Sequence, residues 1–378
     1  MSFGPDVAFV LPALQGGGVE RVYLDLAKAF LTRGLAVDMV LAKAEGPLLR
    51  DLPEGINLVD LNVPRRLRLV RAYPALRDYF ARRKPKVAIP VWDYVDLVPL
   101  WAAWRSQIPC LWVLHNTPSY LRDVRGLKGR VAVWGARKAL REALCHPLAR
   151  VGAVSLGVAE AFARFVGAEP SLIKVLPNPL DRGRIVALAK EEPSELPLDK
   201  GEPFLVAVGR LHSQKGFDLL LRAYAFLVKQ KPFLEAKLLI LGDGPERAKL
   251  EALTDLLGLS SRVFFLGYRA NPYPYLRLAR GLVVSSRYEG LPTVILEALA
   301  LKKPVVAAES EGGVAEALAW GKLGILVPRT VEGLAQGMEQ LLVRGMELPE
   351  EELEAHLERY SLESAVRAYL EVMGELWG

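Results

Sequence analysis

Short apolar runs alternate with longer amphipathic stretches along most of this chain. The first run, residues 7–14, is followed by the glycines at 16–18 and by residues 19–34, whose apolar positions recur with helical spacing. Another apolar run, residues 35–42, follows at once. Later runs of the same kind lie at residues 86–91, 109–114 and 151–155. This alternation predicts parallel strands joined by helices, and therefore a doubly wound α/β sheet.

The alternation stops near Pro177-Asn178-Pro179, where a charged, proline-containing stretch extends to residue 202. A second series of apolar runs then begins, at residues 203–209, 236–242, 262–267, 281–286, 303–308 and 325–328. We predict two Rossmann-like domains, residues 1–180 and 181–360, and a terminal helix at 361–378 that packs back on the first domain. Since such sheets bind ligands at the carboxyl ends of their strands, the predicted site lies in a cleft between the two domains.

Length and composition agree with a two-domain globular protein. The chain has 378 residues, of which 51% are hydrophobic and 24% charged, and domains usually hold about 100 to 200 residues. The most apolar long window, residues 87–104, contains Asp93, Asp96 and two prolines, which are costly in lipid. No membrane span is therefore expected.

The amino-terminal residues and the cysteines indicate the compartment. Residues 1–14 have no basic leader and are predicted to form a strand rather than a signal peptide. Cys110 and Cys145 are the only cysteines and lack metal-ligand spacing, which favours a reducing environment. We expect a cytoplasmic protein that can attach peripherally to the inner face of the cell membrane.

Positive charge is concentrated in the first half of the chain. Residues 1–180 hold 25 Lys and Arg against 15 Asp and Glu, a net charge of +10, whereas the remainder holds 24 against 28, a net charge of −4. Residues 65–150, which include Arg65, Arg66 and Arg68, carry 18 basic and 5 acidic residues with tryptophans interleaved. This pattern suits an anionic membrane surface, nucleic acid or a phosphorylated acceptor, and it is equally typical of a solvated basic face.

Two carboxylates enclose an apolar segment in the second half. Glu289 and Glu297 have seven residues between them, and these include Gly290, Leu291 and Pro292. Pro292 suits the first turn of a helix, which would be apolar on nearly every side apart from Glu297. The side chain of Glu289, the N–H groups of the next two residues and the helix N-terminus can face one site. A phosphorylated, hydroxyl-rich ligand is one interpretation, and a structural ion pair of the buried glutamate is the other.

Two cations lie on a loop between a predicted strand and helix. Arg210 and Lys215 follow the apolar run at 203–209. Arginine can grip phosphate oxygens bidentately and lysine can act as a point charge, so the two together can neutralise a diphosphate leaving group.

Four motifs carry a family resemblance: GGGVER at 16–21, VGRLHSQKGFDLLLRAYA at 208–225, LGDGPERAKLEAL at 241–253, and SSRYEGLPTVILEALALKKPVVAAESEGGVAEAL at 285–318. With these motifs the chain resembles the retaining two-domain (GT-B) glycosyltransferases that use nucleotide sugars, the family 4-like or group 1 enzymes. The match covers nearly all of the second domain. In the first domain it rests on GGGVER and on Leu114-His115-Asn116.

The resemblance implies a role for each site residue. Arg210 and Lys215 would bind the donor diphosphate, Glu297 the ribose, and Glu289 with the backbone of Gly290 and Leu291 the transferred sugar. On the other domain, Gly17 and Gly18 would let the backbone approach the donor, and His115 would face the donor sugar. The base would lie near Tyr268.

The resemblance also implies the reaction. We expect a hexosyl or N-acetylhexosaminyl group to move from a UDP- or GDP-sugar to a glycan or lipid-linked acceptor, in cell-envelope or polysaccharide biosynthesis. The chain contains no Asp-x-Asp sequence, so the predicted transfer needs no metal ion. A transfer of this kind also uses no cofactor. No nucleic-acid partner is expected. Retention would follow a front-face path in which the leaving phosphate helps to deprotonate the acceptor.

Three alternative functions share some of these features. A dinucleotide-dependent oxidoreductase is disfavoured because Gly16-Gly17-Gly18 and Gly242-Asp243-Gly244 lack the complete GxGxxG pattern. A sugar-nucleotide isomerase or epimerase of the same architecture would need no acceptor, so incubation with the donor alone would reveal it. A non-catalytic nucleotide-sugar binding protein is the third alternative, which the presence of Arg210, Lys215 and Glu289 disfavours.

Overall fold

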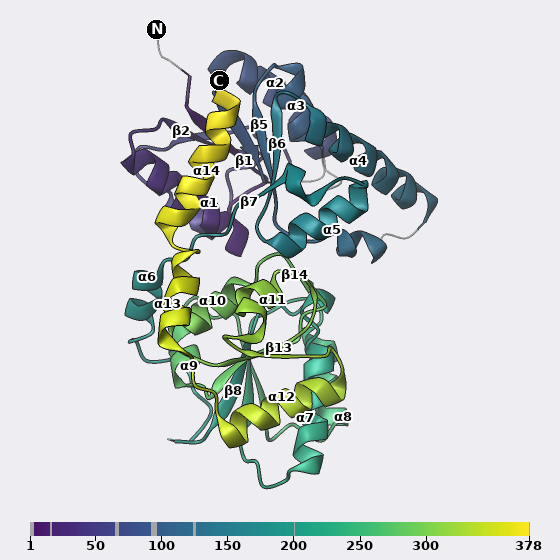
Figure 1. Cartoon of the computed structure of the whole chain (residues 1–378), viewed down its shortest axis with the longest axis vertical. Helices are drawn as coiled ribbons and strands as arrows, with labels where there is room; N and C mark the ends of the chain where they lie inside the picture. The colour runs from purple at the N-terminus through teal and green to yellow at the C-terminus, as the bar shows by residue number, and fades with distance from the viewer. Residues whose placement is uncertain are drawn as a thin grey trace. The chain divides into compact units, whose positions relative to one another are not determined.

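The computed structural model describes residues 4–15, 17–64, 68–91, 97–123, 126–199 and 201–377. The chain divides into two compact units, and each is described by itself: unit 1 is Met1–Pro179 with Leu362–Gly378, and unit 2 is Leu180–Ser361. Among the described residues, each unit is built on one main parallel sheet with helices around it (Figure 1). The predicted fold class, two α/β Rossmann-like domains, is confirmed.

The sheet of unit 1 is parallel throughout its described strands and has the order β3-β2-β1-β4-β5-β6-β7. At its centre β1 pairs Val7 with Val37 of β2 on one side and with Val87 of β4 on the other. The strands are β1 (Val7–Leu11), β2 (Val37–Leu41), β3 (Asn57–Asp60), β4 (Val87–Pro90), β5 (Cys110–Leu114), β6 (Ala149–Ala153) and β7 (Ile173–Val175). All five residues of β1 are fully buried, so helices cover both faces of this sheet.

The helices of unit 1 include one from the far end of the sequence. They are α1 (Gly18–Thr32), α2 (Arg68–Arg83), α3 (Val98–Arg105), α4 (Leu127–Cys145), α5 (Leu156–Val166) and α14 (Leu362–Trp377). Helix α14, yellow in Figure 1, packs on α1 and on β4, β5 and β6. Its Glu375 forms ion pairs with Arg150 at 2.9 Å and Lys174 at 2.8 Å. These contacts join residues 362–377 to the core of unit 1.

The main sheet of unit 2 has the parallel order β10-β9-β8-β11-β13-β15 in the described residues. Its strands are β8 (Phe204–Val208), β9 (Lys237–Leu241), β10 (Val263–Gly267), β11 (Gly281–Val284), β13 (Val305–Ala308) and β15 (Ile325–Val327). The helices are α6 (Arg182–Leu188), α7 (Phe217–Gln230), α8 (Arg247–Leu256), α9 (Tyr273–Leu278), α10 (Thr293–Ala300), α11 (Val314–Ala317), α12 (Val331–Arg344) and α13 (Glu350–Glu358). Strand β8 is central, between β9 and β11, so the loops that follow these strands meet at one edge.

The structure differs from the sequence prediction at several elements. Strands β3 and β7 were not predicted from the apolar pattern. Ser155, expected at the end of a strand, instead caps α5, where its hydroxyl accepts a hydrogen bond from the Val158 N–H at 3.2 Å. Pro292, expected in the first helical turn, is the residue just before α10. Glu289 lies in a two-residue strand, β12 (Tyr288–Glu289), which pairs with β14 (Glu311–Gly312).

Candidate functional site

Two loops of unit 2 touch through their main chains at the carboxyl edge of the sheet. Gly216, between the end of β8 and the start of α7, has a φ of +65°, and a Cβ atom there would lie 2.2 Å from the carbonyl oxygen of Ser285. Both the left-handed backbone and the lack of space therefore require glycine. Ser285 follows β11, which pairs with β8. The residue before Gly216, Lys215, is thereby placed against the loop that leads to Glu289.

A second close approach joins the loop after β9 to the same place. A Cβ atom on Gly242, whose φ is +140°, would lie 1.9 Å from the carbonyl oxygen of Gly209. Gly209 in turn donates its N–H to the carbonyl oxygen of Leu241 at 2.9 Å. The loops that follow three neighbouring strands thus pack against each other through their main chains. This packing restricts the positions of the side chains on these loops.

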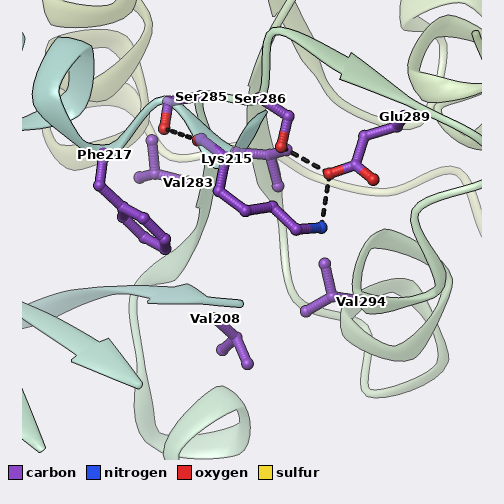
Figure 2. A pocket seen from close by; sticks show the side chains of 9 residues that line it. Val208, Lys215, Phe217, Val283, Ser285, Ser286, Glu289 and Val294 are labelled. Carbon is purple, nitrogen blue, oxygen red and sulfur yellow. Dashed lines mark hydrogen bonds and ion pairs between the residues drawn. The ribbon is translucent and has the colours of Figure 1, made fainter. Parts of the chain in front are cut away.

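At this edge the structure joins two predicted site residues directly. The Lys215 ammonium nitrogen lies 2.6 Å from Oε1 of Glu289, and the Ser286 hydroxyl donates to the same oxygen at 2.6 Å (Figure 2). Glu289 and Ser286 are buried, with 6% and 2% of their surfaces exposed. These three residues line a pocket whose other walls include the apolar side chains of Val208, Phe217, Val283 and Val294. The charge of Glu289 is therefore held by one cation and one hydroxyl in a largely apolar setting.

Further hydrogen bonds fix the two loops that meet here. The Ser285 hydroxyl donates to the carbonyl oxygen of Lys215 at 2.9 Å. The Arg287 N–H donates to the carbonyl oxygen of Gln214 at 2.7 Å, while the Gln214 side-chain amide donates to the Tyr288 carbonyl at 3.0 Å. An ion pair between Arg287 and Asp218 of α7, 2.8 Å long, adds to these. The position of Lys215 relative to Glu289 is thus determined by the backbone as well as by their charges.

The other residues of unit 2 that are predicted to bind the sugar donor differ in how exposed their side chains are. Arg210, on the loop after β8, is exposed, and its side chain forms no ion pair with the residues that the structure describes. Gly290 and Leu291 are buried immediately after Glu289. Tyr268, just after β10, is 69% exposed. Arg210 and Tyr268 thus offer accessible side chains, and the expected contact of a sugar with the backbone of Gly290 and Leu291 stays a prediction.

Glu297 has protein partners that sequence reasoning did not identify. It lies on α10 and is partly buried. Loss of water raises the pKa of its carboxyl group from 4.5 to about 7, against the opposing effects of the positive charge of Arg184 on α6 and a hydrogen bond from Tyr273 on α9. Both partners come from segments remote from the motif, so no spacing in the sequence could have indicated them.

In unit 1, His115 follows β5 and is bonded to α1. Its Nε2 lies 2.6 Å from the hydroxyl oxygen of Tyr23. Burial lowers the pKa of His115 to about 3, so the ring is neutral at physiological pH. Burial raises the pKa of the Tyr23 phenol, and the neighbouring Tyr369 of α14 adds to the rise. His115 thus belongs to a buried aromatic cluster that includes the carboxyl-terminal helix.

The glycine-rich motif at the start of α1 is only partly described, because Gly16 lies outside the described residues. The atoms nearest to a Cβ atom on Gly17 would be those of the flexible Glu20 carboxylate, the first at 2.3 Å, and a Cβ atom on Gly18 would meet no atom of the described chain within 4 Å. Packing within the described chain therefore does not force Gly18 to be glycine. The predicted close approach of a donor to this backbone stays a prediction.

Two partners of the predicted site residues, one in each unit, went unnoticed in the sequence. Ser286 stands three positions before Glu289 at the end of an apolar run, and that position was the available signal. Tyr23 lies on α1 and is fully buried, and its pairing with His115 depends on tertiary packing that has no local signature.

The pairing of Lys215 with Glu289 makes a prediction about stability. Lys215→Met should lower the free energy of unfolding by roughly 2 kcal/mol, because it leaves a buried carboxylate with one hydrogen bond. Adding Glu289→Gln should recover most of that loss. Urea unfolding of the wild type, both single variants and the double variant gives the four free energies of a double-mutant cycle. Equal losses in Lys215→Met and in the double variant would show that the pair carries no such coupling.

The raised pKa of Glu297 predicts a pH-dependent stability. Between pH 4.5 and about 7 the folded state binds more protons at this group than the unfolded state, so its contribution to stability falls as the pH rises through that interval. Glu297→Gln removes this loss, so its melting temperature relative to wild type should rise between pH 5 and pH 8. Glu351→Gln, at an exposed position on α13, controls for the change of one charge. A difference for Glu297→Gln that is the same at both pH values would contradict the prediction.

Two family models match the chain, one on each half. The model of glycosyl transferases group 1 matches residues 189–361, and that of glycosyltransferase family 4 matches residues 16–184. The motifs on the loops after β8, β9 and β11 all fall within the first of these matches.

Curated relatives are similar over part of their length. The chain is 33% identical over 209 residues to the lipopolysaccharide core biosynthesis glycosyltransferase LpsE of Rhizobium meliloti, covering 53% of this chain and 57% of that protein. It is 31% identical over 189 residues to the N-acetylgalactosamine-N,N'-diacetylbacillosaminyl-diphospho-undecaprenol 4-alpha-N-acetylgalactosaminyltransferase of Campylobacter jejuni, covering 50% and 49%. The chain spans about half the length of such relatives.

A solved structure shows the same fold over almost the whole chain. Anabaena Alr3699/HepE, determined in complex with UDP and glucose, has a TM-score of 0.78 at 23% identity, covering 98% of this chain and 99% of that one. The two units, the loops at the carboxyl edge of the second sheet and the two family models lead to one conclusion: the chain belongs to the group 1 glycosyltransferases of GT-B fold.

Proposed function

We propose that this chain is a retaining glycosyltransferase that moves a hexosyl or N-acetylhexosaminyl group from a nucleotide diphosphate sugar to a glycan or lipid-linked acceptor. The observation that carries the proposal is the ion pair between Lys215 and Glu289. The loop that carries Lys215 also carries the exposed Arg210, and it lies within the match to the group 1 family model. These groups suit the two parts of a nucleotide sugar that differ most in charge, the diphosphate and the sugar hydroxyls.

The cations act on the leaving group in this proposal. Arg210, which is exposed, can bind two phosphate oxygens at once, and Lys215 can place a point charge beside the same diphosphate. Negative charge develops there as the glycosidic bond breaks, so preorganised cations lower the barrier. No metal ion is required for this role.

The carboxylates and the neighbouring backbone act on the hydroxyl groups. Glu289 accepts hydrogen bonds from the transferred sugar, with Gly290 and Leu291 contributing backbone N–H groups, and Glu297 accepts from the ribose. The acceptor oxygen attacks the anomeric carbon on the face from which the diphosphate leaves, and the acceptor proton passes to a leaving phosphate oxygen. Tyr268 is assigned to the base, and the assignment of His115 to the donor sugar stays a prediction.

The relatives support the classes of donor and acceptor. HepE binds UDP and UDP-glucose, according to the descriptions of its solved structures. The Campylobacter relative acts on a sugar joined to diphospho-undecaprenol, and the Rhizobium relative acts in lipopolysaccharide core biosynthesis. We therefore favour a UDP-sugar donor and a lipid-linked glycan acceptor of the cell envelope.

Helix α4 offers a surface for the membrane in which such an acceptor is anchored. Its exposed face carries Val131 and Trp134, 60% and 66% exposed. Four exposed cations share that face with helical spacing: Arg130, Arg137, Lys138 and Arg141. Apolar and aromatic side chains ringed by cations suit an anionic bilayer surface. In the described part of the chain no helix has the length and apolarity to cross a bilayer.

Part of the predicted basic surface lies elsewhere. Arg65 and Arg66 are outside the described residues, and Arg68 begins α2. The membrane proposal therefore rests on α4.

Replacing Arg210 by Ala tests the proposed transfer. Turnover should fall by about 100-fold or more, because a preorganised charge on the leaving group is lost. The measurement is release of nucleoside diphosphate from a panel of nucleotide sugars with lipid-linked acceptor. An isomerase changes the sugar without releasing the diphosphate, so the nucleotide sugar recovered after incubation with donor alone is analysed for a new isomer. Arg222→Ala, which removes an exposed arginine from α7, should retain wild-type turnover. Near-normal activity of Arg210→Ala would refute the assigned role.

A double substitution on α4 tests membrane binding. Arg137→Gln with Lys138→Gln should weaken binding to vesicles containing anionic phospholipid about 30-fold, since each cation near such a surface contributes about 1 kcal/mol. Cosedimentation with anionic and with neutral vesicles measures this. The matched control is Arg222→Gln with Lys229→Gln on α7, both exposed. If the two double variants bind anionic vesicles equally well, α4 is not the membrane surface.

A further inference from the structure

The Glu289 carboxylate has two partners of different kinds on one oxygen. Lys215 and Ser286 both contact Oε1, each at 2.6 Å (Figure 2). The Lys215 side chain is 24% exposed, against 8% for that of Glu289, so the ammonium group is the more accessible member of the pair. A lysine ammonium on a flexible four-carbon stem can turn to another anion with little change in the backbone.

Ser286, in contrast, is a fixed partner. Its side chain is short and buried, and it stands two residues after the last residue of β11 on a loop held by Gly216 and Arg287. A hydrogen bond to a charged group contributes more than one between neutral groups, and a buried carboxylate without partners is costly. The hydroxyl can therefore hold the Glu289 carboxylate in place when Lys215 turns away.

A diphosphate and Glu289 require the same ammonium group. Resting on the proposed function, we infer that Lys215 exchanges partners when the donor binds: the ammonium moves from Glu289 to the diphosphate, and Ser286 is the positioning residue that holds the released carboxylate for the sugar hydroxyls. Glu289 is then a built-in competitor of the donor diphosphate. A nucleoside diphosphate without its sugar must compete with Glu289 for Lys215, and it has no sugar hydroxyl to bind the released carboxylate.

Titration calorimetry with UDP, or with GDP if UDP does not bind, tests the exchange. Glu289→Gln should bind the nucleoside diphosphate roughly threefold or more tightly than wild type, because the competing carboxylate is gone. Ser286→Ala should bind it about tenfold more weakly, because giving up Lys215 then leaves Glu289 without either of its partners among the described residues. In the Glu289→Gln background, Ser286→Ala should have no effect, since Ser286 acts through Glu289.

Controls separate this mechanism from simpler ones. Glu351→Gln on α13 removes the same charge at an exposed position and should leave affinity unchanged, which excludes a general effect of net charge. Ser286→Thr keeps the hydroxyl and should restore most of the affinity lost in Ser286→Ala. Melting temperatures show whether each variant is folded.

The outcomes are distinct. Wild-type protein that binds neither UDP nor GDP would overturn the proposed function and this inference together. Wild-type binding with Glu289→Gln no tighter would overturn the exchange alone. A Ser286→Ala loss that persists in the Glu289→Gln background would show that Ser286 acts on the loop rather than on the carboxylate.

Discussion

The carbonyl oxygen of Ser285 occupies the space where a side chain at position 216 would begin. This contact between two backbones leaves no room for a side chain between the loop after β8 and the loop after β11. Lys215 precedes one contact residue and Ser286 follows the other, and both side chains contact the same oxygen of Glu289. The polar site of unit 2 thus depends on a glycine that has no polar role of its own.

The sheets explain why that contact can be so close. Strands β8 and β11 are neighbours in the main sheet of unit 2, and β9 lies on the other side of β8. Their register fixes where each loop begins, and the approach of Gly242 to Gly209 adds a second point of contact. Loops that begin at strand ends and pack against each other through their backbones keep much of the precision of the sheet. Lys215 and Glu289 therefore have a defined geometry before any ligand is bound.

Much of this architecture follows from the chain's apolar pattern. Buried central strands such as β1 and β8 consist of consecutive apolar residues, which is the signal expected of a parallel sheet covered on both faces. Strands β3 and β7 lie at the two edges of their sheet and are short and partly exposed. Edge strands need no continuous apolar run, so a search for such runs passes over them.

The site was predictable as a set of residues but not as a set of contacts. Arg210, Lys215 and Glu289 are conspicuous as charges at the ends of apolar runs. Lys215 and Glu289 are 74 positions apart in the sequence. Nothing in that spacing indicates that they pair, because the pairing depends on the approach of Gly216 to Ser285. Glu297 shows the same limit, since Arg184 and Tyr273 influence its pKa from two other helices.

Helix α14 makes unit 1 discontinuous in the sequence, whereas unit 2 is contiguous. During synthesis, unit 2 can therefore bury its whole core as soon as residue 361 has left the ribosome. Unit 1 must wait longer, because α14 packs on α1, and Glu375 pairs with Arg150 and Lys174, only after residues 362–377 have emerged. The half of the protein that is translated first is thus the last to complete its packing, and a chain interrupted just short of α14 would carry a finished unit 2 beside an unfinished unit 1.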